Sequence, residues 1–241
     1  NNGWHDMRSN TYTIVFTSIV TIVLGFLLAV AADALKERQE LNVANDMKKN
    51  ILLSLGFKPA ADKIWSSEEI HSLFDKNINA IVLDAKGNKT DKDPKKIDTV
   101  KDIENLPIYI KKSGNKIGGY AIPIAGKGLW STLYGYFAVE PDGRTVKGIT
   151  FYKHGETPGL GAEVDKLWFQ KNFIGKKFVD ESDQLVGVKV VKGKVLSDDP
   201  KAIHKVDGIS GATMTGKGLE VFLLDDLLKY EPFFKAIRGN S

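Results

Sequence analysis

Small turn residues and hydroxyls are concentrated at Asp207–Thr213, which reads Asp-Gly-Ile-Ser-Gly-Ala-Thr. Gly208 and Gly211 permit positive φ and the close approach of another group to the backbone. Successive amides in such a turn form a concave anion site, and the partly positive start of the following helix adds to it. Lys217, expected in the first turn of that helix, adds charge. A phosphate would fit at Ser210–Thr215, but residue types alone favour an ordinary Ser/Thr helix cap with a glycine turn.

A second unusual loop reads His-Gly-Glu-Thr-Pro-Gly-Leu-Gly at His154–Gly161. Three glycines and one proline in eight residues specify a fixed backbone path between a predicted strand and a predicted helix. Fixed loops between regular elements often form ligand sites, and the alternative is a structural connector. Glu156 has the chemistry of a general acid or base, but the sequence shows no partner for it. We therefore do not predict acid–base catalysis.

Composition excludes several other classes of site. The 241 residues include no cysteine, which rules out disulfides, thiolate metal sites and cysteine nucleophiles. The four histidines lie far apart without ligand spacing, so we predict no metal site. The formal net charge is +4, but 34 basic residues are mixed with 30 acidic ones. A mixed solvated surface is expected from this pattern, and no nucleic-acid motif is present.

The elements that carry these loops follow an apolar N-terminal segment. No charged residue occurs in Asn10–Ala32, and about 20 such residues are enough to cross a bilayer as a helix. We predict a tail over 1–9 and a membrane helix over 10–34. The alternative is a cleaved signal peptide, because Ala29-Val30-Ala31 resembles a cleavage site. The apolar run is longer than a signal core, which favours the membrane anchor.

The remaining segments predict one α+β domain with an antiparallel sheet and flanking helices. A helical connector is expected over 35–57, with an apolar face at Leu41, Ala44, Met47, Ile51, Leu52 and Leu55 and a stop at Gly56. The domain itself is expected over 58–241. Its predicted elements are a capping box at Ser66–Glu69, a strand and turn over 78–88, an exposed loop at Lys86–Asp102, hairpins over 106–124 and 133–152, a short helix over 163–173, a strand at Leu185–Val191 and a helix at Met214–Tyr230.

Three separated motifs resemble one known family. The Asp207–Thr213 segment matches the flavinylation motif Asp-x-x-Ser/Thr-Gly-Ala-Thr of FMN-binding domains. The stretches GETPGLGAEV and GKGLWSTLYGYFAVEPDG are similar to the C subunit of the Na+-translocating NADH:quinone oxidoreductase. The G subunit of the related Rnf complex shares the ETPGLG and SGAT elements, whereas Gly128–Ser131 and the FAVEPDG turn favour the first of these two families. The resemblance extends over about Gly126–Leu228.

The resemblance implies a covalently bound FMN whose phosphate is esterified to Thr213. Thr215 is the nearest rival hydroxyl, but it lies outside the motif. The other residues that the resemblance and the two loops assign to flavin binding are Asp207, Ser210, Gly211, Ala212, Thr215, Lys217, Leu129, Trp130, Glu156, Thr157, Gly159 and Leu160. Leu129 and Trp130 are expected to shield the ring, with core packing as the alternative for Trp130.

The resemblance also implies partners and a location. The family assembles with the A, B, D, E and F subunits into an NADH:ubiquinone reductase that translocates sodium. The chain alone is an electron carrier between an iron centre of other subunits and the FMN of the B subunit. A separate flavin transferase attaches FMN taken from FAD with Mg2+ outside the inner membrane, which implies a single-pass protein with a periplasmic domain. The alternatives are the Rnf G subunit and a membrane-anchored binding or scaffold protein without a redox cofactor.

Overall fold

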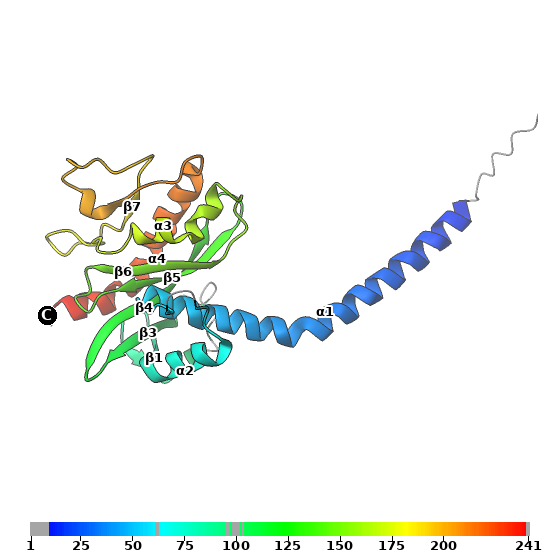
Figure 1. Ribbon diagram of the computed structural model, residues 1–241, viewed down its shortest axis with the longest axis horizontal. Helices are drawn as coiled ribbons and strands as arrows, with labels where there is room; N and C mark the ends of the chain where they lie inside the picture. The colour runs from blue at the N-terminus through cyan, green and yellow to red at the C-terminus, as the bar shows by residue number, and fades with distance from the viewer. Residues whose placement is uncertain (1–9, 61–62, 95–96, 98–101, 103, 240–241) are drawn as a thin grey trace, which may run out of the picture. The chain divides into compact units, whose positions relative to one another are not determined.

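The computed structural model describes residues 10–60, 63–94, 97, 102 and 104–239, which fall into two compact units, Asn1–Ala44 and Asn45–Ser241 (Figure 1). The first unit consists, where described, of the exposed beginning of helix α1 (Asn10–Ser54). Within the described residues, α1 is the one helix long and apolar enough to cross a membrane. The predicted N-terminal apolar helix is therefore confirmed, and it continues without a break into the second unit.

The end of α1 belongs to the core of the second unit. Ile51 and Leu52 are buried, as is Leu55 directly after the helix. Leu41, which lies earlier on the predicted apolar face, is exposed. Gly56 ends the helix at φ +82°, donating to the Leu53 carbonyl while Phe57 donates to that of Leu52. This pair of bonds is a Schellman motif, which satisfies carbonyls left free at a helix end. The predicted stop at Gly56 is confirmed.

The capping box is also confirmed at the start of α2 (Ser67–Asn77). The Ser66 hydroxyl accepts from the amide of Glu69, and the Glu69 carboxylate accepts from the amide of Ser66. Ile70 of α2 is buried against the same face of the sheet as the end of α1. The predicted exposed loop at Lys86–Asp102 contains the short strand β2, and residues 95, 96 and 98–101 of that loop lie outside the described part of the chain.

A six-stranded antiparallel sheet forms the centre of the domain in the order β2-β1-β3-β4-β5-β6. Both predicted hairpins are confirmed: Ser113 pairs with Lys116 across one turn, and Glu140–Gly143 turns between the strands of the other. β4 pairs with β3 only through residues up to Ala121, so its far end is bonded to β5 alone. The strands are β1 (Ile78–Leu83), β2 (Lys89–Thr90), β3 (Leu106–Ser113), β4 (Lys116–Lys127), β5 (Thr132–Val139) and β6 (Val146–Lys153).

Successive side chains along each strand point to opposite sides of the sheet, and both faces of the sheet are apolar. Tyr109 and Tyr136 lie on the face covered by α2 and the end of α1. Ile122 and Phe137 lie on the opposite face, in the larger core that includes α4 and Phe169 (Figure 1). The domain is thus a sheet with helices on both sides, as the sequence predicted.

The segment after β6 is mostly irregular. It contains η2 (Gly161–Asp165), α3 (Leu167–Lys171), β7 (Lys189–Val190), η3 (Ala202–His204) and β8 (Lys205–Val206). The predicted strand at Leu185–Val191 is wrong in extent, because only Lys189–Val190 is a strand, and it pairs in parallel with β8 outside the main sheet. Gly187 and Gly193, at φ +70° and +85°, turn the backbone on either side of it, so a longer strand does not form.

Helix α4 (Thr213–Gly239) closes the domain and is longer than predicted. Its predicted stripe is buried throughout: Leu219, Phe222, Leu223, Leu227 and Tyr230. The helix continues past Pro232 because Phe234 and Arg238 extend the stripe, and Arg238 donates to the Gly143 carbonyl at 3.1 Å. This packing outweighs the cost of an interior proline.

Candidate functional site

The Glu156 carboxylate connects three segments that are far apart in the sequence. One oxygen, Oε1, accepts from the amides of Trp130 at 2.9 Å and Ser131 at 3.0 Å. The other, Oε2, accepts from the amide of Leu129 at 3.2 Å and from the Thr215 hydroxyl at 2.7 Å. Glu156 therefore holds the loop between β4 and β5 together with the first turn of α4.

Two glycines leave the space that this carboxylate occupies. A Cβ on Gly128 would lie 2.7 Å from Glu156 Oε1, and a Cβ on Gly161 would lie 2.7 Å from Oε2 and 2.6 Å from the Thr215 hydroxyl oxygen. Any larger residue at either position would displace the carboxylate or its donors. Gly161 of the ETPGLG segment and Gly128 of the GKGLWS segment thus leave room for Glu156.

Glu156 is ionised over the physiological pH range. Burial, which leaves only 5% of the residue exposed, acts to raise the pKa of its carboxyl. The hydrogen bonds from Thr215 and from the amides of Trp130, Ser131 and Leu129 outweigh this effect and hold the pKa below its ordinary value. The predicted loop residue is therefore a buried anion held by donors.

The Asp207–Thr213 segment lies against a neighbouring loop. The Asp207 carboxylate accepts from the amide of Val195 at 2.8 Å, and the amide of Gly208 donates to the Gly193 carbonyl at 2.8 Å. A Cβ on Gly208 would collide with the carbonyl oxygen of Val191. Asp207 and Gly208 thus fix the path of the segment that leads into α4.

Gly211 brings the two sequence motifs together. Its φ is +73°, a conformation that favours glycine, and a Cβ there would lie 2.7 Å from Leu160 Cδ2. Leu160 follows Gly159, also at φ +73°, in a turn closed by a bond from the Leu160 amide to the Thr157 carbonyl at 3.1 Å. The structure therefore places the ETPGLG loop beside the SGAT turn.

Thr213 is the first residue of α4, and its side chain is exposed. Within the described part of the chain, its hydroxyl has no hydrogen-bond partner, and neither do the backbone amides of Thr213, Met214 and Thr215. Free amides at a helix start favour an anion. By contrast, Thr215 is only 1% exposed, and its hydroxyl is bonded to Glu156. The two threonines of this turn thus differ in both access and bonding.

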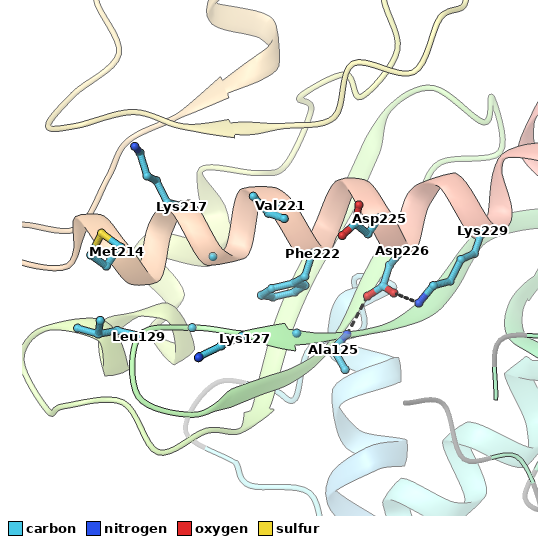
Figure 2. Close-up of a pocket in the computed structure, with 13 residues that line it drawn as sticks. Ala125, Lys127, Leu129, Met214, Lys217, Val221, Phe222, Asp225, Asp226 and Lys229 are labelled. Carbon is cyan, nitrogen blue, oxygen red and sulfur yellow. Dashed lines mark hydrogen bonds and ion pairs between the residues drawn. The ribbon is translucent and has the colours of Figure 1, made fainter. Parts of the chain in front are cut away.

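Lys217 lies slightly further along α4 than the sequence suggested. Because α4 begins at Thr213, Lys217 is just beyond the first turn and shares the helix face of Thr213, four residues away. Its side chain is exposed and points away from β4 (Figure 2). Ser210 is exposed and Ala212 is buried, with the Ala212 amide bonded to the Ile209 carbonyl at 3.1 Å.

A groove of about 700 Å³ runs between the end of β4 and α4. Residues 125–129 line one side, and α4 residues from Met214 to Lys229 line the other (Figure 2). Phe222 and Asp226 point from the helix toward β4, and the Asp226 carboxylate accepts from the Ala125 amide at 2.8 Å. Asp226 therefore satisfies a donor on the part of β4 that lacks β3 as a neighbour.

Several apolar side chains stand exposed around this end of the domain. Trp130 is 72% exposed, and Leu129, Leu160 and Met214 are each exposed by about two fifths or more. Core packing, the alternative considered for Trp130, is therefore wrong. Exposed apolar side chains that lie close together are a common feature of binding sites.

Sequence reasoning missed three parts of the site. Ser131 bridges two loops, accepting from the Gly155 amide at 2.6 Å while its hydroxyl lies 3.4 Å from Glu156 Oε1. The donors of Glu156 and the strand partner of Asp226 were also missed. A signal for Asp226 was present, because an acidic residue between Phe222 and Tyr230 interrupts the apolar stripe of α4.

Comparison with known proteins gives consistent results. The FMN-binding domain family model matches residues 128–222. The chain is 34% identical to the C subunit of the Na(+)-translocating NADH-quinone reductase of Pseudomonas aeruginosa, covering 90% of this chain and 91% of that protein. It is also 34% identical to the C subunit from Vibrio anguillarum, covering 98% of this chain and 99% of the relative.

A solved structure agrees in fold. The crystal structure of the C subunit of the Na(+)-translocating NADH-quinone reductase of Parabacteroides distasonis superposes with a TM-score of 0.73 at 34% identity. The superposition covers 83% of this chain and 96% of that one.

Proposed function

The chain belongs to the family of C subunits of the Na(+)-translocating NADH-quinone reductases, and on that premise we propose that it carries FMN covalently on Thr213 as an electron-transfer subunit. The proposal rests on the exposure and the hydrogen bonding of Thr213. Its hydroxyl is exposed and unpartnered among the described residues, and it stands at the start of α4 beside free backbone amides. The residues present therefore fit a phosphoester at this position.

The choice between the two threonines rests on access. An enzyme that attaches a flavin must reach the acceptor oxygen, and Thr215 is buried and already donates to Glu156. Modification of Thr215 would remove that bond and open the turn. Modification of the Thr213 hydroxyl would break no hydrogen bond of the described structure.

The start of α4 would hold the phosphate. The amides of Thr213, Met214 and Thr215 supply donors, and the partly positive helix end favours the remaining negative charge. Lys217, on the same helix face, adds a cation within reach of that region. Gly211 keeps the turn open, since a side chain there would collide with Leu160.

Exposed apolar residues would cover the ring. Leu129 and Trp130 are held by their amides on Glu156, and Leu160 lies against the SGAT turn. Thr157 and Gly159 shape the turn that presents Leu160. When bound, FMN supplies the redox chemistry, and the protein fixes its place and tunes its electronics.

The wider assignment follows the family. We propose a single-pass inner-membrane protein with a periplasmic domain, anchored by the apolar part of α1 and flavinylated there by a transferase that uses FAD and Mg2+. In the complex with the A, B, D, E and F subunits, the chain would accept electrons from an iron centre and pass them to the FMN of the B subunit. The long apolar α1 and the relatives named above support this membrane-anchored assignment.

Mass spectrometry of the denatured chain tests the proposal. After co-expression with a flavin transferase, we expect a mass gain of one FMN minus water and yellow in-gel fluorescence. Peptide mapping should place the modification on Thr213. An unmodified mass would count against the flavoprotein and favour a binding or scaffold protein, whereas a modified Thr215 would overturn the site alone.

A further inference from the structure

The Glu156 carboxylate is a buried charge without a cationic partner. Among the described residues it forms no ion pair, and each contact that satisfies it is a neutral donor: three amides and a hydroxyl, with Ser131 Oγ nearby. Neutral donors stabilise a carboxylate but do not cancel its net charge. A full negative charge therefore remains at the centre of the site.

A neutral acceptor would complete much of the same geometry. Glutamine has the same length, and its oxygen would accept from Trp130 and Ser131. Its amide group would face the Thr215 hydroxyl, which is able to accept, and the Leu129 amide, whose bond would be lost. The donors outweigh the cost of burying the charge, so the pKa of the Glu156 carboxyl is lowered and the side chain stays ionised although it is buried. Glutamine would thus remove the charge while keeping most of the bonds that hold the loops together.

The charge lies between the two parts of the proposed flavin site. Thr215, bonded to Glu156, is two residues from the acceptor Thr213, and Leu129 and Trp130, also bonded to it, present the exposed apolar side chains. A flavin attached at Thr213 and covered by Leu129 and Trp130 must lie near this carboxylate. Because Glu156 is buried, water screens its charge less than it would screen the charge of a surface carboxylate.

We propose that Glu156 is a positioning residue that also sets the reduction potential of the flavin. This inference rests on the proposed attachment of FMN to Thr213. Its hydrogen bonds fix the Leu129–Ser131 loop against the first turn of α4. Its negative charge opposes the negative charge that the flavin gains on reduction, so it lowers the midpoint potential.

The variant Glu156→Gln separates charge from geometry. We expect Glu156→Gln to fold, to carry covalent FMN on Thr213, and to shift the flavin midpoint potential in the positive direction in a spectroelectrochemical titration of the purified full chain. Glu181→Gln is the matched control, because Glu181 is an exposed acid in the turn between Asp180 and Gln184. Its potential should equal that of the wild type.

Glu156→Asp provides the complementary change. It keeps the charge on a side chain one methylene shorter, which does not reach all of the donors. We expect a midpoint potential that is not more positive than the wild type, together with reduced flavin occupancy. A positive shift in Glu156→Asp as large as that in Glu156→Gln would contradict the role of the charge, because Glu156→Asp retains it.

The measurements distinguish the two proposals. The mass spectrum of the wild-type chain decides whether FMN is attached, and therefore decides the proposed function. If FMN is present in the wild type and in Glu156→Gln, but their midpoint potentials agree or the variant shifts negative, the role of Glu156 is overturned while the attachment stands.

Discussion

Thr213 and Thr215 lie in the same first turn of α4 with opposite environments: the hydroxyl of Thr213 faces solvent, and that of Thr215 donates to Glu156 at 2.7 Å. Two residues correspond to about 200° of rotation around a helix, so the two side chains point to opposite sides. One threonine is available for chemistry, and the other ties the helix to the loops.

Replacing Thr213 by alanine should abolish covalent flavin without affecting the fold. Because the side chain is exposed and unpartnered in the described structure, we expect a change in unfolding free energy within about 0.5 kcal/mol. Thr213→Ser is the matched control and should retain FMN, since it keeps the hydroxyl. Flavin fluorescence in a denaturing gel reports the result; persistence of the signal in Thr213→Ala would refute the assignment.

Replacing Thr215 by valine should have the reverse effect. Valine keeps the shape but removes the donor to a buried carboxylate, which should lower the unfolding free energy by about 1–3 kcal/mol. Denaturant unfolding of the flavin-free chain measures the loss. Peptide mapping of the flavinylated variant should still find FMN on Thr213, and loss of attachment at wild-type stability would be the contrary outcome.

The pH dependence of stability should reveal the charge of Glu156. Its pKa is lowered in the folded state, so its contribution is fully present above its ordinary pKa of 4.5 and is lost as the pH falls through the lower folded value. The difference in unfolding free energy between the wild type and Glu156→Gln should therefore shrink below about pH 4.5. Urea titrations at a series of pH values test this, and a difference that grew on acidification would have the wrong sign.

The close packing of α4 on β4 predicts a strong effect at Gly218. A Cβ there would collide with the carbonyl oxygen of Lys127, a backbone atom that has little freedom to move. We expect Gly218→Ala to lower the unfolding free energy by about 1–3 kcal/mol, as overpacking does. Gly239→Ala in the same helix meets no atom within 4 Å and should be neutral or slightly stabilising. Equal melting temperatures for both variants would contradict the packing.

Local signals in the sequence predicted the regular elements well. The capping box at Ser66–Glu69, the stop at Gly56 and the Pro-Asp-Gly turn depend on residues close in sequence, and all three are confirmed. The extent of α4 was underestimated because Pro232 suggests an end locally, whereas the burial of Phe234 is a tertiary effect.

The sequence singles out residues of the proposed site, but not how they are brought together. The motifs identified Thr213 and Glu156, but the donors of Glu156 are 25 to 59 positions away in the chain. Bonds over such separations depend on strand register and helix packing, which no local pattern encodes. The parallel pairing of β7 with β8 was missed for the same reason.

The last turns of α1 limit where the chain can be cut to separate the domain from its apolar N-terminal helix. Because Ile51, Leu52 and Leu55 are core residues, a protease cut or truncation downstream of them would remove part of the hydrophobic interior as well as the tether. A water-soluble fragment must therefore begin no later than about Asn45, where the second compact unit starts.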